Sequence, residues 1–303
     1  MALLEIQDVE KSFGSKKVVN NVNFQVSEGA LFGMLGPNGA GKTTTIRMIM
    51  GIIEPDAGSV FFMGKPRGDG AKREIGYLPE ERGLYDEAKV LEVLGYLGNL
   101  KGLKRSRAEQ RAKDWLNTLE LSEAEDVKIK ELSKGMAQKV QFIASILHGP
   151  KLAILDEPFA GLDPVNQELF KSVIKRLKGE GMTILLSSHR MNMVEELCDK
   201  IFMIHDGREV LSGELSAVKE GFGKDLVNLK FHGDPAVLRE VFASRISNVE
   251  LDEESGSFYI EKGVTPDQFL REIPSGVEIT EISVKKPPLH DIFISTVRGD
   301  GDE

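Results

Sequence analysis

The chain has 303 residues, 41% of them hydrophobic and 29% charged, which is ordinary for a globular protein of about two domains. Its formal net charge of −9 is unevenly placed, since residues 221–303 hold 9 Lys+Arg against 16 Asp+Glu. This acidic region argues against nucleic acid or an anionic lipid surface as a partner. The single cysteine, Cys198, excludes an internal disulfide, and no apolar run approaches the ~20 residues of a membrane-spanning helix.

The first two thirds of the chain alternate between strand and helix patterns. Apolar residues at Val22, Phe24 and Val26 alternate with polar ones and predict a half-buried strand. Short, continuous apolar runs predict strands that are covered on both faces of a parallel sheet. In chain order, the elements expected here are strand 29–36, helix 43–53 ending before Pro55, strand 58–64, strand 152–158 and strand 182–189.

Two longer helices carry their own start signals. Ser106 and Glu109 have the spacing of a capping box and predict a helix over 106–120. Its apolar face is expected to hold Ala108, Ala112, Trp115, Leu116 and Leu119. Asp163-Pro164 opens a second helix, which Gly179 ends. The residues expected to face the core there are Val165, Leu169, Phe170, Val173, Ile174 and Leu177.

The composition changes near residues 219–225, where we place the boundary between a domain over 1–220 and a domain over 221–303. The elements expected in the second domain are strand 226–232, helix 235–244, strands 248–252 and 256–262, helix 265–273, strand 276–284 and helix 287–298. This βαββαβ order with a final helix suggests a small α+β domain of the ferredoxin-like type.

The stretch GPNGAGKTT (36–44) is a phosphate-binding pattern placed between an apolar strand and a helix. Its glycines let backbone amides close around phosphates, Lys42 brings a charge to the outer phosphates, and the Thr43 hydroxyl is a ligand for Mg²⁺. This setting makes a chance glycine-rich turn a poor explanation. The residues expected to contact the nucleotide are Gly36, Pro37, Asn38, Gly39, Ala40, Gly41, Lys42, Thr43 and Thr44.

Polar residues follow two of the apolar strands. Asp156 and Glu157 end one strand and His189 ends another, so all three are expected at the carboxyl edge of the sheet. Asp156 is expected to hold the shell of a Mg²⁺ ion, and Glu157 to polarise an attacking water. His189 is expected to bond the γ-phosphate or that water, although a single histidine is more often structural.

Two further features are less self-explanatory. In ELSKGMA (131–137), Ser133 and Gly135 indicate a helix start, whose unpaired amides and positive dipole end suit an anion. The stretch lacks the lysine–hydroxyl pair and the acidic ligand of a complete nucleotide site, so it leaves open whose anion it binds. Phe13, near a loop tip, is a candidate for stacking on adenine, with ordinary packing as the alternative.

In this order the motifs resemble those of the ATP-binding subunits of ABC transporters, over residues 3–215. GPNGAGKTT resembles the Walker A loop, LAILDEP (152–158) Walker B, GLDP (161–164) the D-loop and LSKGM (132–136) the signature. His189 stands at the switch histidine and Phe13 at the adenine-stacking position. The resemblance implies an α/β fold, a P-loop NTPase with a RecA-like core, an antiparallel β subdomain and a helical subdomain. It also implies that Ser133 and Gly135 serve a nucleotide held by a second chain, and that Asp163 of the D-loop contacts nucleotide.

Three positions depart from the family pattern. Lys134 and Met136 replace a glycine and a glutamine of the signature, and Glu80 replaces the glutamine found in most members. A carboxylate at Glu80 remains a possible ligand for Mg²⁺ or its water. The stretch YLPEERGLY (77–85), with an appended acidic domain, resembles the ATP-binding subunits of sodium-exporter-type and related ABC-2 export systems.

The resemblance implies that two copies, or this chain and a homologue, enclose two Mg·ATP and hydrolyse them. A separate polytopic membrane subunit would then export a cargo such as sodium or a drug. The chain would be cytoplasmic and peripheral on the inner face of the cell membrane. A soluble ABC-type ATPase of translation or repair is an alternative, opposed by the single cassette and the lack of heptads. An ATP-holding regulatory module is another, supported only by Glu80, Lys134 and Met136.

Overall fold

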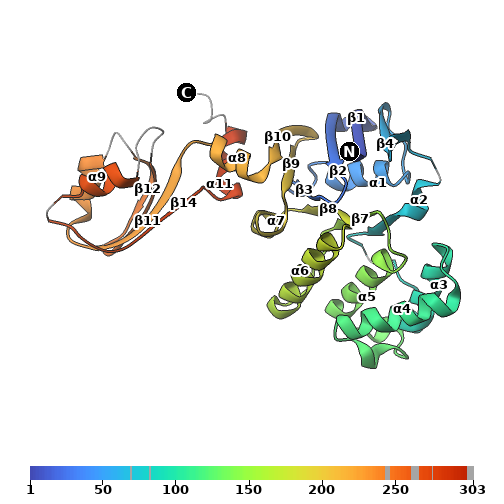
Figure 1. Cartoon of the computed structure of the whole chain (residues 1–303). Coiled ribbons are helices and arrows are strands. Elements are labelled where there is room, and N and C mark those ends of the chain that lie inside the picture. Colours follow the sequence, from blue (N-terminus) through green and yellow to red (C-terminus); the bar gives the residue numbers. More distant parts are fainter. Residues whose placement is uncertain (69, 82, 243–245, 261–265, 275, 299–303) are drawn as a thin grey trace. The chain divides into compact units, whose positions relative to one another are not determined.

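The computed structural model describes the chain except for residues 69, 82, 243–245, 261–265, 275 and 299–303 (Figure 1). The chain forms two compact units, Met1–Gly213 and Glu214–Glu303. The division places α8 (Leu215–Gly221) in the second unit, a few residues before the boundary expected from composition.

A six-stranded sheet forms the centre of the first unit. Its order is β10 (Arg208–Glu214), β9 (Lys200–His205), β3 (Leu31–Leu35), β8 (Thr183–Ser188), β7 (Leu152–Asp156) and β6 (Ile75–Leu78). The strands from β9 to β6 pair in parallel. Every residue of β3, β7 and β8 is buried, as their continuous apolar runs predicted. The order β3-β8-β7 brings the ends of these three strands side by side.

A smaller antiparallel sheet packs in the same unit, with the order β2 (Lys16–Ser27), β1 (Ala2–Phe13), β4 (Ala57–Phe62) and β5 (Lys65–Pro66). The sequence prediction missed β1, because register shifts along it break the alternation of apolar residues. Asp8 has φ 50°, in the left-handed region, and lies within the register shift between Ile6 and Val9. Buried residues of both sheets, among them Ile6, Val22 and Met34, share one core.

Helices complete the first unit. They are α1 (Lys42–Ile49), α2 (Ala71–Glu74), α3 (Val90–Leu100), α4 (Arg105–Thr118), α5 (Lys134–Ile146), α6 (Pro164–Gly179) and α7 (Met191–Leu197), with short 3₁₀ turns at Ser122–Ala124 and Ile129–Glu131. Figure 1 shows α3, α4 and α5 grouped beside the sheet. No helix in the described part of the chain is long and apolar enough to cross a membrane.

Two predictions about these helices were wrong in detail. The capping box predicted from Ser106 and Glu109 does not form. Helix α4 starts at Arg105, so its N-cap residue is Lys104, and the Lys104 side chain makes no capping hydrogen bond. Ser106 therefore lies inside the first turn, while Glu109 pairs with Arg105 at 2.9 Å. Val165, expected in the core, is 77% exposed, because it lies in the first turn of α6, before the helix reaches the sheet.

The second unit has the expected order of elements: β11 (Asp225–His232), α9 (Pro235–Phe242), β12 (Ile246–Leu251), β13 (Ser255–Ile260), α10 (Pro266–Arg271), β14 (Glu278–Lys285) and α11 (Leu289–Arg298). Its antiparallel sheet has the order β12-β13-β11-β14, in which β13 separates β11 from β12. This is the split βαβ arrangement of a ferredoxin-like fold. The parts of the predicted elements that fall on residues 243–244, 261–262 and 265 lie outside the described residues.

Candidate nucleotide site

The loop between β3 and α1 has a backbone that only glycine permits. A Cβ atom on Gly36 would lie 2.2 Å from the carbonyl oxygen of Ile204. Gly41 has φ 111°, and a Cβ there would lie 2.8 Å from the oxygen of Val18. The loop is closed internally by the Ala40 N–H, which donates to the Pro37 oxygen at 3.2 Å. It leads directly into α1, whose first amides lack helical partners and suit an anion.

Lys42 and Thr43 begin α1 and point their polar groups to different partners. Lys42 is only 6% exposed, and its Nζ donates to the oxygens of Gly36 at 2.7 Å and Pro37 at 3.1 Å. Burial lowers the pKa of this ammonium group, and the nearby carboxylates Glu157 and Asp156 oppose the shift. The Thr43 hydroxyl donates to Asp156 Oδ2 at 3.1 Å. The end of β7 thus lies against the start of α1.

Asp156 has two features expected of a residue that holds a metal ion, burial and an unpaired carboxylate oxygen. Its side chain is fully buried, and burial raises the pKa of the carboxyl. Its Oδ1 has no hydrogen-bond partner among the described residues. Because a buried, unpaired oxygen is costly, an ion or water bound beside Thr43 would relieve the cost. The described residues hold no cluster of three acidic, His or Cys ligands, so a cation here needs oxygens from a ligand or water.

Glu157 occupies a strained position that fixes its direction. Its φ of 49° lies in the left-handed region, which a non-glycine residue adopts at an energetic cost. One carboxylate oxygen, Oε1, accepts from the His189 N–H at 2.7 Å and contacts His189 Nδ1 at 2.8 Å. The other, Oε2, accepts from Ser188 Oγ at 3.1 Å. The expected catalytic pair is therefore in direct contact.

A cavity of about 320 Å³ lies over the phosphate-binding loop. It is at the carboxyl edge of the sheet, where ligands of open α/β sheets bind. Glu80, on the loop after β6, is among the residues that line it. The lining residues are Val18, Asn38, Gly39, Gly41, Lys42, Thr43, Thr44, Glu80 and Glu157.

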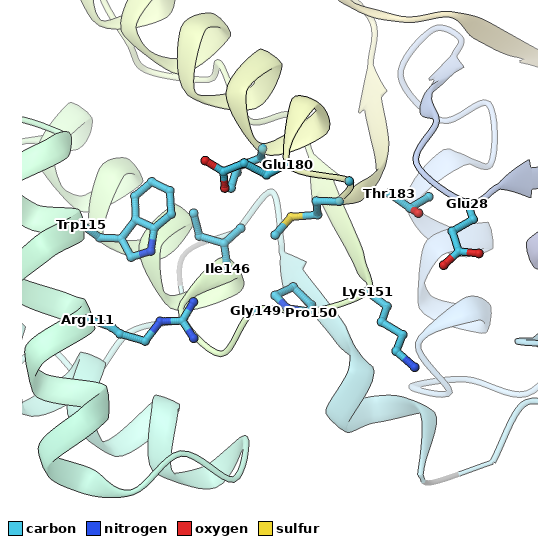
Figure 2. A pocket seen from close by; sticks show the side chains of 12 residues that line it. Glu28, Arg111, Trp115, Ile146, Gly149, Pro150, Lys151, Glu180 and Thr183 are labelled. Carbon is cyan, nitrogen blue, oxygen red and sulfur yellow. The ribbon is translucent and has the colours of Figure 1, made fainter.

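A second cavity of about 320 Å³ lies at the opposite edge of the same sheet (Figure 2). Its walls include Lys151 and Thr183, at the amino ends of β7 and β8, together with Arg111 and Trp115 of α4. It contains none of the residues predicted to bind nucleotide. Six of the residues predicted to bind nucleotide, Asn38, Gly39, Gly41, Lys42, Thr43 and Thr44, line the cavity over the phosphate-binding loop instead.

Nine predicted site residues do not line that cavity: Phe13, Gly36, Pro37, Ala40, Ser133, Gly135, Asp156, Asp163 and His189. Phe13 ends β1, is 54% exposed, and has the Lys11 ammonium 5.9 Å from its ring centre. Asp163 caps α6, accepting from the Asn166 N–H at 3.0 Å. The predicted helix start at Ser133 is present, since its hydroxyl accepts from the Met136 N–H at 3.2 Å. Gly135, in the first turn of α5, faces the loop before α6 instead.

Gln141 is a residue that sequence reasoning missed. It lies on α5, is 4% exposed, and its Nε2 donates to the oxygens of Pro79 and Glu81, both at 3.2 Å. These two carbonyls flank Glu80, so the amide fixes the loop that brings Glu80 to the cavity. A signal was available, because a glutamine interrupts the apolar face of α5 between Val140 and Phe142.

Comparisons with known proteins agree with this geometry. Residues 19–160 match the family model described as ABC transporter. Residues 213–297 match the model described as ATP-binding protein DrrA1-3-like, C-terminal domain. Among solved structures, that of an ATP binding subunit of an ABC transporter is 34% identical, with a TM-score of 0.68, and the match covers 73% of this chain and 93% of that one.

Two full-length relatives extend the match. An ABC transporter ATP-binding protein of Bacillus subtilis, YhaQ, is 40% identical over 307 residues, covering 97% of this chain and 98% of the relative. The Nod factor export ATP-binding protein I of Burkholderia lata is 34% identical over 264 residues, covering 86% of each chain. With the phosphate-binding loop and the paired acids already in place, these matches show that the chain belongs to the ATP-binding, ATP-hydrolysing subunits of ABC transporters.

Proposed function

We propose that the ATP which this subunit hydrolyses binds in the cavity over residues 36–44, with the residue roles given below. The observation that carries the proposal is the convergence of Lys42, Thr43 and Glu157 on one cavity at the carboxyl edge of the sheet, with Asp156 hydrogen-bonded to Thr43. These groups come from two distant parts of the sequence. A structural role alone gives no reason for a buried lysine beside two buried carboxylates.

The loop amides and Lys42 would hold the β- and γ-phosphates. Lys42 Nζ now bonds two carbonyl oxygens of its own loop, and these are weaker partners than phosphate oxygens. Exchange of these partners for phosphate oxygens needs only a change in the flexible side chain. The dipole of α1 adds to the attraction for the phosphates.

Thr43, Asp156 and Glu80 are the oxygen donors that would hold Mg²⁺. When bound with ATP, Mg²⁺ neutralises part of the charge on the phosphates. Thr43 and Asp156 are already hydrogen-bonded to each other. Among the described residues Oδ1 of Asp156 has no partner, so it is available to a ligand. Glu80 lies on the cavity wall across from them, with its loop held by Gln141.

Glu157 would orient the attacking water and accept its proton. The backbone strain and the bonds from Ser188 and His189 fix its carboxylate at the cavity. A base held in one direction needs little reorganisation when the reaction starts. His189 would contact the γ-phosphate after turning from Glu157, since its ring is half exposed.

The remaining predicted residues would complete the site across a dimer. Two copies, or this chain and a homologue, would enclose two ATP, and Ser133, Gly135 and Asp163 would meet the nucleotide of the partner. The helix start at Ser133 supports this, because an exposed N-terminus with a serine cap suits the γ-phosphate. Phe13 would stack on adenine in its own chain, where its exposed ring is available.

The dimer would drive export through a separate polytopic membrane subunit. The name of the Burkholderia relative specifies export of Nod factor, and we extend the direction of transport, but no cargo, to this chain. The exposed rings of Tyr85 and Tyr96, packed edge to face beyond the Glu80 loop, would contact that subunit. The chain would then lie peripherally on the inner face of the membrane, and ATP hydrolysis would reopen the dimer and switch its partner.

The test is the Glu157→Gln variant. It should bind Mg·ATP, lose about 10²–10⁴-fold in kcat, and accumulate as a dimer in ATP, because the site closes without turnover. Analytical ultracentrifugation with and without Mg·ATP measures the dimer. Glu123→Gln, a change on an exposed 3₁₀ turn, is the matched control and should behave as wild type. A Glu157→Gln variant that binds ATP and stays monomeric contradicts the proposed dimer.

A further inference from the structure

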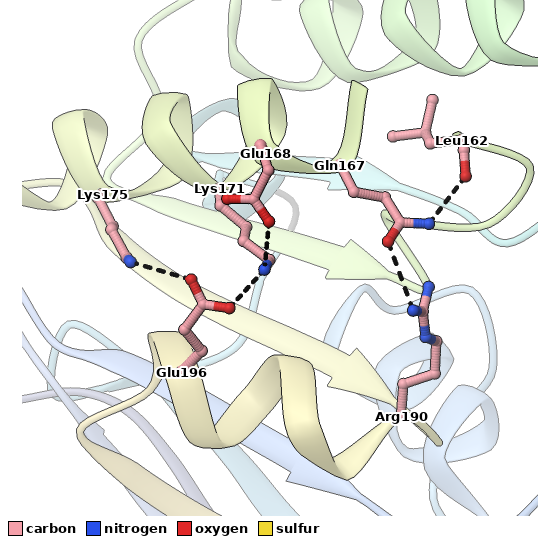
Figure 3. A network of polar contacts seen from close by, with 7 residues as sticks. All are labelled: Leu162, Gln167, Glu168, Lys171, Lys175, Arg190 and Glu196. Carbon is pink, nitrogen blue, oxygen red and sulfur yellow. Dashed lines mark hydrogen bonds and ion pairs between the residues drawn. The ribbon is translucent and has the colours of Figure 1, made fainter. Parts of the chain in front are cut away.

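Polar contacts join the start of α6 to the segment before α7 (Figure 3). The Gln167 amide uses both of its ends. Its Nε2 donates to the backbone oxygen of Leu162 at 2.8 Å, and its Oε1 accepts from Arg190 Nη2 at 3.4 Å. Leu162 precedes the cap of α6, and Arg190 follows His189 directly. One side chain therefore connects the loop before α6 to the segment that carries His189.

The contacts continue from Arg190 to the proposed base. The Arg190 backbone N–H donates to Ser188 Oγ at 3.0 Å, and Ser188 Oγ donates to Glu157 Oε2 at 3.1 Å. His189, between these two residues, holds the other oxygen of Glu157. These hydrogen bonds, linked by the side chains of Gln167 and Arg190, form a continuous path from the Leu162 carbonyl to the Glu157 carboxylate.

A second group of contacts fastens α7 to α6. Lys171, whose side chain is 9% exposed, bonds Glu168 at 2.8 Å and also bonds Glu196 of α7. Lys175 reaches the same Glu196 at 3.3 Å. Because two lysines of α6 share one carboxylate of α7, the two helices are joined at Glu196 and should move together.

We propose that Gln167 and Arg190 form a positioning relay, through which the loop over 158–163 controls the direction of the Glu157 carboxylate. This rests on the proposed function, in which Asp163 of that loop meets a partner chain. Neither relay residue touches the phosphates.

The weakest bond of the path defines how the relay works. The Gln167–Arg190 contact is the longest at 3.4 Å, while the bonds to either side of it are 2.8–3.1 Å. A shift of the loop would therefore break it first. Arg190 would then be free to move with His189 and Ser188, and Glu157 would lose the donors that fix both of its oxygens.

The two arms of the relay can be cut separately. Gln167→Glu keeps an acceptor for Arg190 and loses the donor to Leu162, while Arg190→Leu removes the other arm. Gln167→Leu removes both bonds of the amide. The lost bond to the Leu162 carbonyl is worth about 1 kcal/mol and the long bond from the charged Arg190 guanidinium about as much, so Gln167→Leu should lower kcat about five- to thirty-fold, with less than about a twofold change in KM for ATP. Gln167→Glu should fall between it and wild type.

A double-mutant cycle separates a relay from local packing. Residues of one path do not add, so Gln167→Leu combined with Arg190→Leu should lose no more kcat than the worse single variant. Ser172→Ala, exposed on the same helix and bonded only within it, is the control and should keep wild-type kcat. Circular dichroism melts confirm folding of each variant. Additive losses, or Gln167→Leu with wild-type kcat, overturn the relay.

The outcome is independent of the dimer test. Wild-type kcat in Gln167→Leu refutes the relay even if Glu157→Gln forms a trapped dimer. Conversely, a monomeric Glu157→Gln refutes the dimer, while a non-additive cycle in kcat still supports the path from Leu162 to Glu157 within one chain.

Discussion

At the scale of single residues, burial decides what the site can do. Lys42 and Asp156 are polar groups inside the protein, where an unpaired charge is costly. Lys42 bonds two carbonyls and Asp156 bonds Thr43, but Asp156 keeps one oxygen unpaired among the described residues. This arrangement favours ligand binding. A phosphate would give Lys42 stronger partners than the two carbonyls, and its cation would give the unpaired Asp156 oxygen a partner.

Gln141 extends this argument to the Glu80 loop. Gln141→Leu has a similar volume but leaves the oxygens of Pro79 and Glu81 without their donor, so Glu80 is no longer fixed. Two lost bonds of about 1 kcal/mol each predict a five- to thirty-fold rise in the Mg²⁺ concentration for half-maximal ATPase activity, with a smaller fall in kcat. Titrating Mg²⁺ at saturating ATP measures it.

The control for Gln141→Leu is Gln110→Leu, since Gln110 is exposed on α4 and bonds only Asp114. It should leave the Mg²⁺ dependence unchanged. If Gln141→Leu also keeps the wild-type Mg²⁺ dependence, the amide has only a packing role and Glu80 is placed by other contacts.

At the scale of elements, local sequence signals predicted the strands and helix starts that depend on a few neighbouring residues. The runs that became β3, β7 and β8 are buried and mostly apolar, and Ser133 and Asp163 cap the helices that they were expected to start. Signals failed where tertiary contacts overrode them. The bulges of β1 hid its period, and the capping box predicted at Ser106 and Glu109 was two residues out of step with the observed N-cap, Lys104. Gln141 stands out in the sequence because it interrupts an apolar run, but its partners and those of Gln167 include distant segments, so no local pattern predicts these contacts.

The ion pairs of Glu196 on α7 with Lys171 and Lys175 on α6 should make the stability of the fold depend on pH. Hydrogen bonds from Lys171, the main cause, lower the pKa of Glu196 below its usual 4.5. A carboxyl with a depressed folded pKa stabilises the fold above its unfolded pKa and loses that effect as the pH falls through the folded pKa. The melting temperature of Glu196→Gln should therefore lie below wild type at pH 7.

The difference in melting temperature should shrink as the pH falls below about 4.5. Calorimetric scans of both proteins from pH 7 to pH 3.5 measure the trend. Glu123→Gln, the exposed control used above, should show a smaller change at pH 7. A difference that stays constant over this range contradicts the assigned role of Glu196.

At the scale of the whole molecule, the serine-capped helix start of one chain does not line the cavity over the phosphate-binding loop of that chain. Ser133 and Gly135 start α5, whereas the cavity is lined by residues from the phosphate-binding loop, Glu80 and Glu157. The motif order in the sequence predicted both halves, but a single chain leaves them apart. The proposed solution is a symmetric pair, in which each phosphate loop faces the helix start of the other copy.

Mixing two inactive variants tests that arrangement. Ser133→Asp places a negative charge where the partner's γ-phosphate would lie, and Glu157→Gln removes the base, so each variant alone should lose activity. In a mixed dimer, one site combines Glu157 of the first copy with Ser133 of the second and is intact. With random pairing, half of the dimers are mixed and one of their two sites works, so about a quarter of wild-type ATPase activity should return.

The recovered activity should depend on the mixing ratio and peak at equal amounts of the two variants, since mixed dimers are then most abundant. Mixing either variant with Glu123→Gln gives the reference for an active partner that carries both groups. If instead each site used Ser133 of its own chain, every site in every dimer would carry one defect. The mixture would then stay inactive at all ratios, and the composite site would be refuted.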